Sequence, residues 1–218
     1  MGFSSIVSGF RVGTLALGLA VVAGGAMSLP VLAAPEPEVV PTRWELKTKF
    51  SPLRVLTVDT PEGPRAFVYM TYEVTNTAGQ DVFFAPTFDL VTADGTVERS
   101  GKGVSAEATK KVIAYVNDPE VKDQIAVIGT LLQGEENARV GIVIWSGEQL
   151  RPGELTVYAA GFSGESTTVT PPKTADGKAA AEGVVLRKTK SLTYKTPGEI
   201  SQIKDTPMNP VETGWVMR

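Results

Sequence analysis

Ser163 is a candidate nucleophile, because it lies in the segment Gly161-Phe162-Ser163-Gly164-Glu165, directly after a predicted strand. In the G-x-S-x-G turn of hydrolases, a sharp strand-to-helix turn exposes a serine nucleophile that a histidine activates. Here Glu165 stands where that pattern needs glycine, and the chain contains no histidine. We therefore interpret the segment as a glycine-rich turn leaving a strand, and we predict no catalytic residue.

The absence of histidine and cysteine removes several other kinds of site. Triads that use histidine or cysteine, the usual zinc sites, and haem or copper sites all need imidazole or thiolate groups. Carboxylate acid–base chemistry, with two acids about 5–10 Å apart across a cleft, remains chemically possible. A serine–lysine pair and calcium binding by oxygen atoms also remain possible. The composition thus favours a protein that is not an enzyme and has no cofactor.

Two groups of oxygen-bearing side chains could bind calcium. They are Glu135, Glu136 and Asn137 after Gly134 in one loop, and Asp118, Glu120 and Asp123 around Pro119 in another. Neither group has the alternating D-x-D-x-D-G spacing of a calcium loop. We interpret both as solvated turns and predict no metal site, with calcium binding kept as an alternative.

Several aromatic residues fall close together if two neighbouring strands pair. They are Phe67, Tyr69, Phe83, Phe84 and Phe88. An exposed aromatic platform would suggest glycan or peptide binding, whereas a β-sandwich normally buries such residues. We expect these side chains, and also Trp44 and Trp145, to lie in the core.

The charge balance bears on the class of partner. The chain has 21 basic and 24 acidic residues and a formal net charge of −3, so it lacks the basic surface typical of nucleic-acid-binding proteins. Lys110 and Lys111 are expected on the solvated face of a helix. A protein or cell-envelope partner is the remaining expectation.

Residues 1–33 have the three parts of a secretory signal peptide. Arg11 supplies a positive charge, residues 12–27 contain no charged residue, and Val31-Leu32-Ala33 precedes the predicted cleavage after Ala33. This pattern predicts a periplasmic or secreted protein with no membrane span after cleavage. A retained anchor is the alternative, although the apolar run is shorter than the roughly 20 residues that span a bilayer. Residues 34–42 are predicted to form an extended, proline-rich spacer.

Alternating apolar and polar residues predict strands in the next part of the chain. The segments are 42–50, 53–60 and 66–76, with 81–84 returning antiparallel to the strand before it and 87–95 following. In the segment 66–76, the face with Val68, Met70, Tyr72 and Val74 is the better core candidate.

Four-residue spacing of Val104, Ala108, Val112 and Val116 predicts one amphipathic helix, beginning near Ser105 and ending before Pro119. Residues 121–132 fit a helix or a strand equally well. Strand signals return in 137–145, 154–162 and 184–198, the last as a strand pair or one long strand. Residues 197–218 are predicted to form an extended C-terminal tail that wraps the surface or stays mobile.

Short strands separated by turns predict a mainly β fold, an Ig-like antiparallel β-sandwich over residues 43–196 with one inserted helical segment. The stretch YEVTNTAGQDVFFAPTFDLVTADGT resembles an Ig-like family of exported bacterial proteins, the immunoprotective-extracellular type. The matching positions are Val74, Asn76, Thr77, Gly79, Phe88, Leu90, Asp94 and Gly95, and later Gly134, Glu135, Val143 and Trp145.

This resemblance covers roughly residues 44 to 165 and implies an extracytoplasmic, often adhesive or inhibitory, interaction role. The helix between Ser105 and Val116 is longer than the family pattern. Since fold analogy does not transfer function, we expect only a non-enzymatic extracytoplasmic domain that acts through protein or envelope contacts. An exposed sheet edge or the helix would be the contact surface. A glycan- or calcium-binding module is the alternative.

Overall fold

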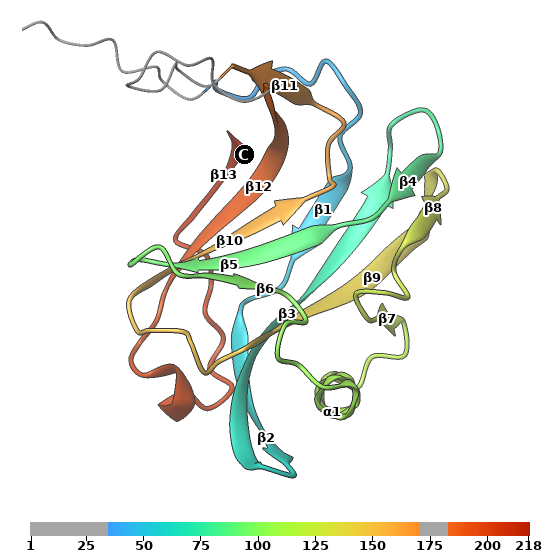
Figure 1. Cartoon of the computed structure of the whole chain (residues 1–218). Helices are drawn as coiled ribbons and strands as arrows, with labels where there is room; N and C mark the ends of the chain where they lie inside the picture. The colour runs from blue at the N-terminus through green and yellow to red at the C-terminus, as the bar shows by residue number, and fades with distance from the viewer. Residues whose placement is uncertain (1–34, 171–182) are drawn as a thin grey trace, which may run out of the picture. The chain divides into compact units, whose positions relative to one another are not determined.

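In the computed structural model, which describes residues 35–170 and 183–218, strand β3 (Gly63–Asn76) is the centre of the first sheet (Figure 1). Strands β1 (Lys47–Phe50) and β2 (Arg54–Thr60) pair with successive parts of one edge of β3. Strand β9 (Gly134–Ser146) pairs along the other edge, and β7 (Val121–Lys122) adds a short parallel pairing to β9. The predicted signal peptide, residues 1–33, lies outside the described residues.

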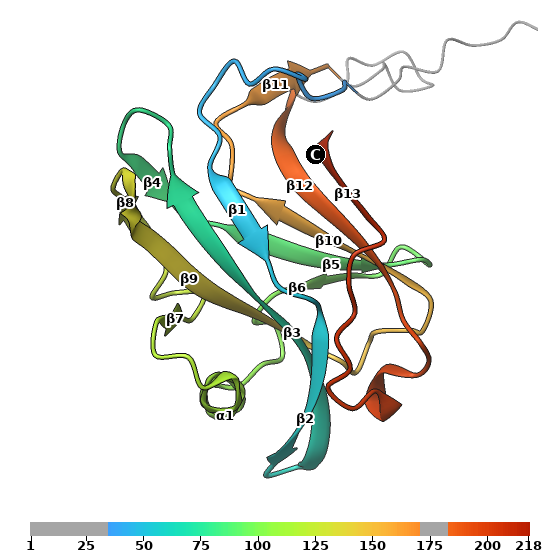
Figure 2. The same ribbon diagram turned by 180° about the vertical axis from the view of Figure 1, so that it is seen from behind.

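The second sheet is built around β12 (Val184–Lys195), which confirms one long strand there. Its other strands are β5 (Thr87–Thr92), β6 (Val97–Arg99), β10 (Glu154–Ala160), β11 (Ser166–Val169) and β13 (Glu212–Met217). All of its pairings are antiparallel. Figure 2, a view from behind, shows the two sheets facing each other.

The core between the sheets follows from the period-two pattern of the strands. Val68, Met70, Tyr72 and Val74 are all buried in it, as predicted from the sequence. Tyr72 is the hub of an aromatic cluster whose other rings belong to Phe50, Phe84, Phe88 and Phe162. These two layers confirm the predicted mainly β sandwich; its Ig-like relationship stays a prediction.

Helix α1 (Ala106–Val116) covers the outer face of the first sheet. Ala108 and Val112 pack there against Phe67, Tyr69 and Ile142, so the part of β3 around Phe67 and Tyr69 is buried on both faces. The Oγ atom of Ser105 accepts a hydrogen bond from the Ala108 N–H at 3.1 Å, which starts the helix where the sequence predicted. The inserted helix is therefore a second packing layer.

Strand β4 (Val82–Phe84) does not return along β3, and the prediction that it would was wrong. It pairs instead with β8 (Gly129–Leu131) in a separate two-stranded sheet. Both edges of β3 are already occupied, and Asn76 Nδ2 donates hydrogen bonds to the carbonyls of Gln80 and Leu131, at 2.8 Å each. The turn after β3 is thereby directed toward β8.

Residues 121–132, left open between helix and strand, form β7, a turn and β8. The segment after residue 197 is more integrated than a surface tail, since it contains a short 3-10 helix, η1 (Ile200–Gln202), and strand β13. Strand β13 pairs with an otherwise unpaired edge of β12, and this pairing satisfies the backbone hydrogen-bonding groups of β13. Within residues 35–170 and 183–218, no helix is both long and apolar enough to cross a bilayer.

Candidate functional site

The turn that contains Ser163 positions a carboxylate. Ser163 Oγ accepts a hydrogen bond from the Glu165 N–H at 3.2 Å, and Phe162 is fully buried in the core. The neighbouring segment that begins at Trp44 pairs with this turn, because the Gly164 N–H donates to the Trp44 carbonyl at 2.9 Å. The turn therefore directs the Glu165 carboxylate toward strand β12.

Three of the five carboxylates considered for calcium have separate partners. Glu135 forms an exposed ion pair with Lys47 at 3.0 Å. Asp118 and Asp123 accept hydrogen bonds from backbone N–H groups of their own turns. In the part of the chain that the structure describes, no three acidic side chains gather as a metal site would require.

A buried lysine on β12 brings together residues from three distant parts of the chain. Lys188, 2% exposed, lies 3.2 Å from Glu45 Oε2 and 3.1 Å from Glu165 Oε2. Neither carboxylate oxygen accepts a hydrogen bond within the described residues, so the positive charge of Lys188 is what compensates their burial. We call Lys188, Glu45 and Glu165 the Lys188 cluster.

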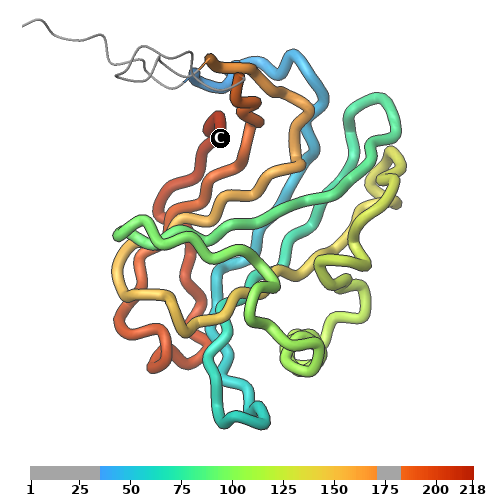
Figure 3. The backbone as a smooth tube through the Cα atoms, viewed as in Figure 1, coloured from blue at the N-terminus to red at the C-terminus, as the bar shows by residue number. Residues whose placement is uncertain are grey.

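The Lys188 cluster holds the segment that precedes Trp44. Glu165 Oε1 accepts a hydrogen bond from the Glu38 N–H at 2.8 Å, and Lys188 Nζ donates one to the Glu38 carbonyl at 3.0 Å. Both backbone groups of a single residue are thus bound, while its side chain is exposed. We call residues 35–41 the strap; Figure 3 shows this N-terminal stretch passing close to β11 and β12.

The ionisation of the Lys188 cluster fits these contacts. Burial alone would lower the pKa of Lys188, but the ion pairs with Glu165 and Glu45 outweigh it and raise the pKa above its ordinary value. The hydrogen bond from the Glu38 N–H, aided by Lys188, holds the pKa of Glu165 below its ordinary value despite burial. At neutral pH Lys188 and Glu165 are therefore both charged.

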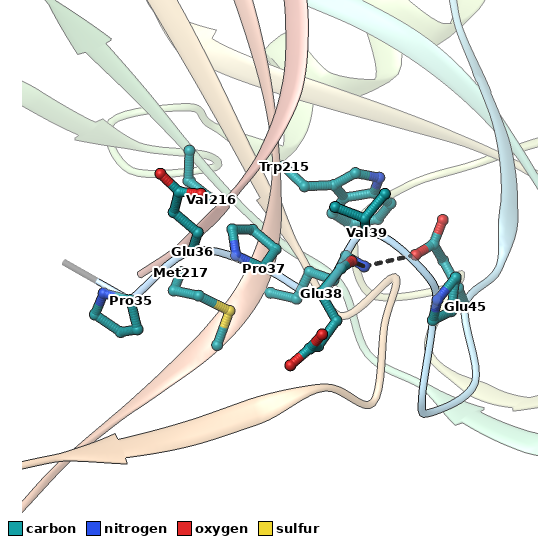
Figure 4. A pocket seen from close by; sticks show the side chains of 11 residues that line it. Pro35, Glu36, Pro37, Glu38, Val39, Glu45, Trp215, Val216 and Met217 are labelled. Carbon is teal, nitrogen blue, oxygen red and sulfur yellow. Dashed lines mark hydrogen bonds and ion pairs between the residues drawn. The ribbon is translucent and has the colours of Figure 1, made fainter. Parts of the chain in front are cut away.

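A groove of about 730 Å³ separates the strap from the end of β13 (Figure 4). Trp215 and Met217 line it from β13, and Pro35 and Pro37 line it from the strap. Pro35 and Pro37 are half-buried, whereas the residues after each of them are exposed. Alternate strap residues therefore turn inward. We call this space and the Lys188 cluster together the strap groove.

The strap groove was not predicted from the sequence. Lys188 and Lys190 share a parity with Leu192 and Tyr194, which places all four side chains on the inward face of β12. Both lysines lie near the Trp215 ring, with Nζ atoms 5.3 and 4.8 Å from its centroid. Two lysines in register with core residues were the available signal.

A second polar cluster holds the other end of the chain. Asp205 pairs with Arg54 at 3.1 Å and accepts hydrogen bonds from the hydroxyls of Tyr69 at 3.2 Å and Tyr115 at 2.7 Å. Burial would raise the pKa of Asp205, but the hydrogen bonds from Tyr115, Arg54 and Tyr69 hold it below its ordinary value. We call these four residues the Asp205 cluster.

The exposed aromatic platform considered from the sequence reduces to one residue. Four of the five aromatic side chains are buried, whereas Phe83 is 68% exposed on β4. Thr130 of β8 lies opposite Phe83, and Ile128 and Leu132 lie two residues on either side of it with 43% and 49% exposure. Phe83 on β4, with Ile128 and Leu132 on either side of β8, thus gives three exposed apolar side chains around the exposed Thr130.

Phe83 also lines a groove of about 350 Å³. Half-buried Trp44 lines it together with Val185 and Arg187, and Gly164 forms part of its floor. A side chain at position 164 would collide with the Trp44 indole, so glycine is required there. We call Phe83, Ile128, Leu132 and this groove the Phe83 surface.

Comparison with known proteins adds no assignment: no protein-family model matches the chain, and no characterised protein or solved structure is significantly similar to it.

Proposed function

We propose that this chain is a non-enzymatic, extracytoplasmic β-sandwich that binds a cell-envelope protein through the Phe83 surface. The observation that carries the proposal is the exposure of three apolar side chains, Phe83 on β4 and Ile128 and Leu132 on either side of β8. Contiguous apolar side chains on a soluble domain are a common feature of protein-binding surfaces. The signal-peptide pattern of residues 1–33 supports placing the partner outside the cytoplasm.

The position of the surface supports the same proposal. Phe83 lies on β4 and Leu132 directly follows β8, and these two strands form a small sheet of their own (Figure 1). Both side chains are exposed, so substitutions of them spare the core. A large aromatic anchor flanked by aliphatic residues and by a groove is the composition that concentrates binding energy at protein interfaces. A partner that inserts one apolar side chain would fit the groove of the Phe83 surface.

Site-specific photo-cross-linking in intact cells tests the proposal. A photoreactive residue at position 83 should give one discrete protein adduct, and a second substitution, Leu132→Asp, should abolish that adduct. The matched control is position 211, because Val211 is 60% exposed and lies away from the β4–β8 sheet. Identical adducts from positions 83 and 211, or none from position 83, would refute the proposal.

Glycan binding is the second candidate, because Trp44 and Arg187 line the same groove beside Phe83. Aromatic faces bordered by polar groups suit sugar rings. A rise in the thermal midpoint with one oligosaccharide, lost in Trp44→Ala and retained in Leu132→Asp, would favour this candidate over protein binding.

A further inference from the structure

We propose that the strap groove also accepts the strap of a second copy of this chain, so that two copies exchange residues 35–41 and form a symmetric dimer. This inference is independent of the Phe83 surface. It rests on how the strap is bound, how it is joined to the sandwich, and which of its side chains remain exposed.

The strap is bound by contacts that a second copy reproduces completely. Its fixed point is the backbone of Glu38, held by Glu165 and Lys188, and Pro35 and Pro37 turn toward Trp215 and Met217. None of these contacts requires the strap to belong to the same chain as the groove. Exchange of identical segments is for this reason a low-cost route to a dimer.

The last strap residues, 39–41, and residues 42 and 43 form a short bent hinge between the strap and the sandwich. Residues 39–43 are all exposed, with bends at 39–40 and 42–43. Regular contacts with the sandwich begin at Trp44, whose carbonyl accepts from the Gly164 N–H at 2.9 Å, and continue at Glu45, which bridges Ser163. A short bent hinge favours exchange, because straightening it carries the strap away from its own groove.

Two exposed valines in the hinge favour a second copy of this chain as the molecule that supplies the strap. Val39 and Val40 are 97% and 75% exposed, the highest values among the large apolar side chains of the described residues. In an exchanged dimer the two hinges pass each other at the two-fold axis, where all four valines become mutually buried. β-branched residues also favour the extended conformation that a straightened hinge adopts.

The same geometry predicts different effects on the dimerisation equilibrium and on the rate of subunit exchange. Contacts of the Lys188 cluster with Glu38 are present once per chain in monomer and dimer alike, so they cancel from the dimerisation equilibrium. They must break, however, each time a strap changes grooves. The valines act in the opposite way, because their burial exists only in the dimer.

The first experiment measures mass by light scattering across a concentration series of residues 34–218, because residues 35–170 and 183–218 belong to one compact unit. We expect a dimer fraction that rises with concentration, and an association constant that falls by about tenfold or more in Val39→Ser/Val40→Ser. Val211→Ser, which changes an exposed valine elsewhere, should leave it unchanged. A chain that stays monomeric up to roughly 1 mM, or a dimer indifferent to the double substitution, overturns the proposal.

The second experiment distinguishes strap exchange from simple contact between valines. Preformed dimers of ¹⁴N- and ¹⁵N-labelled chains are mixed, and the mixed species is followed by native mass spectrometry. Glu165→Gln should speed subunit exchange without changing the association constant, and Glu135→Gln, on an exposed carboxylate, should change neither. If Glu165→Gln fails to fold, Glu38→Pro weakens the same contact by removing the N–H. A subunit exchange rate unaffected by either change overturns the proposal.

Discussion

The Lys188 cluster and the Asp205 cluster each hold one end of the described chain against the sandwich, but they bind different groups. Lys188 and Glu165 belong to the sandwich and bind the backbone of Glu38. Asp205 belongs to the C-terminal segment itself and inserts its own carboxylate between Arg54, Tyr69 and Tyr115. The first contact does not depend on the strap residue's side chain, whereas the second depends on one particular side chain.

The backbone of Asp205 reinforces that difference. Its φ angle is 37°, in the left-handed region that asparagine and aspartate tolerate better than most residues. Its N–H donates to the Val55 carbonyl at 3.1 Å, and Arg54 also donates to the Asp205 carbonyl at 2.9 Å. The C-terminal segment is fixed at one residue in side chain and backbone together, so we expect it not to exchange.

The largest effect should come from the cation of the Lys188 cluster. Lys188→Met leaves the Glu165 carboxylate and the buried Oε2 atom of Glu45 without a counter-charge, which should lower the free energy of unfolding by about 3–5 kcal/mol. Lys49→Met removes an exposed pair with Glu73 and should have no measurable effect. Urea titrations of both variants measure this difference, and equal losses would show that burial of Lys188 is not decisive.

Removal of the Asp205 carboxylate should have a smaller effect. Asp205→Ala deletes the acceptor for two tyrosine hydroxyls and the partner of Arg54, which should lower the free energy of unfolding by about 2 kcal/mol. Asp205→Asn keeps an acceptor and tolerates the left-handed backbone, so its loss should be smaller. Equilibrium unfolding of the two variants would contradict this account if asparagine were as damaging as alanine.

Acid should weaken both clusters in the same pH range. The pKa values of Glu165 and Asp205 lie below their ordinary values, so the folded state favours the ionised carboxylates. Their contribution is complete above the unfolded-state pKa values of about 4 and is lost as the pH falls through the lower folded-state values. The thermal midpoint should therefore fall below pH ~4, and Asp205→Asn should make that fall less steep. An unchanged slope in Asp205→Asn would contradict the role of Asp205.

The smallest effect should come from the strap residue itself. Glu38→Ala should leave the free energy of unfolding unchanged within error, because only its backbone is bound. Glu38→Pro removes the N–H and leaves Glu165 Oε1 without its donor, which should cost about 1–2 kcal/mol. Thermal unfolding of the two variants tests the distinction; a large loss in Glu38→Ala would mean that the side chain is used.

The elements of the fold were largely predictable because their signals are local. Alternation in β3 and four-residue spacing in α1 both appear within a dozen residues of sequence, and both were confirmed. The pairing of β4 with β8 was not predictable, since it depends on which strands already occupy β3. Burial of both faces of β3 likewise depends on where α1 packs.

The Lys188 cluster and the Asp205 cluster could not be predicted from the sequence, for a different reason. Arg54 and Asp205 are 151 residues apart, and nothing local to either residue indicates the other. Lys188 was overlooked because a lysine is expected in solvent unless it is paired. Its carboxylate partners lie on segments that only the tertiary fold brings to β12. The predicted turn at Gly161–Glu165 was interpreted correctly as a turn, yet its Glu165 proved to be the polar group of interest.

Amide hydrogen exchange at residue 38 tests the central distinction between the two clusters most directly. We predict slow exchange of this amide in the wild-type chain, equally slow exchange in Glu38→Ala, and fast exchange in Glu165→Ala, where the acceptor is gone. Exchange of the Glu38 amide at the rate of a solvent-exposed amide in the wild-type chain would contradict the account. Loss of protection in Glu38→Ala would also contradict it, because the strap would then be held by its side chain.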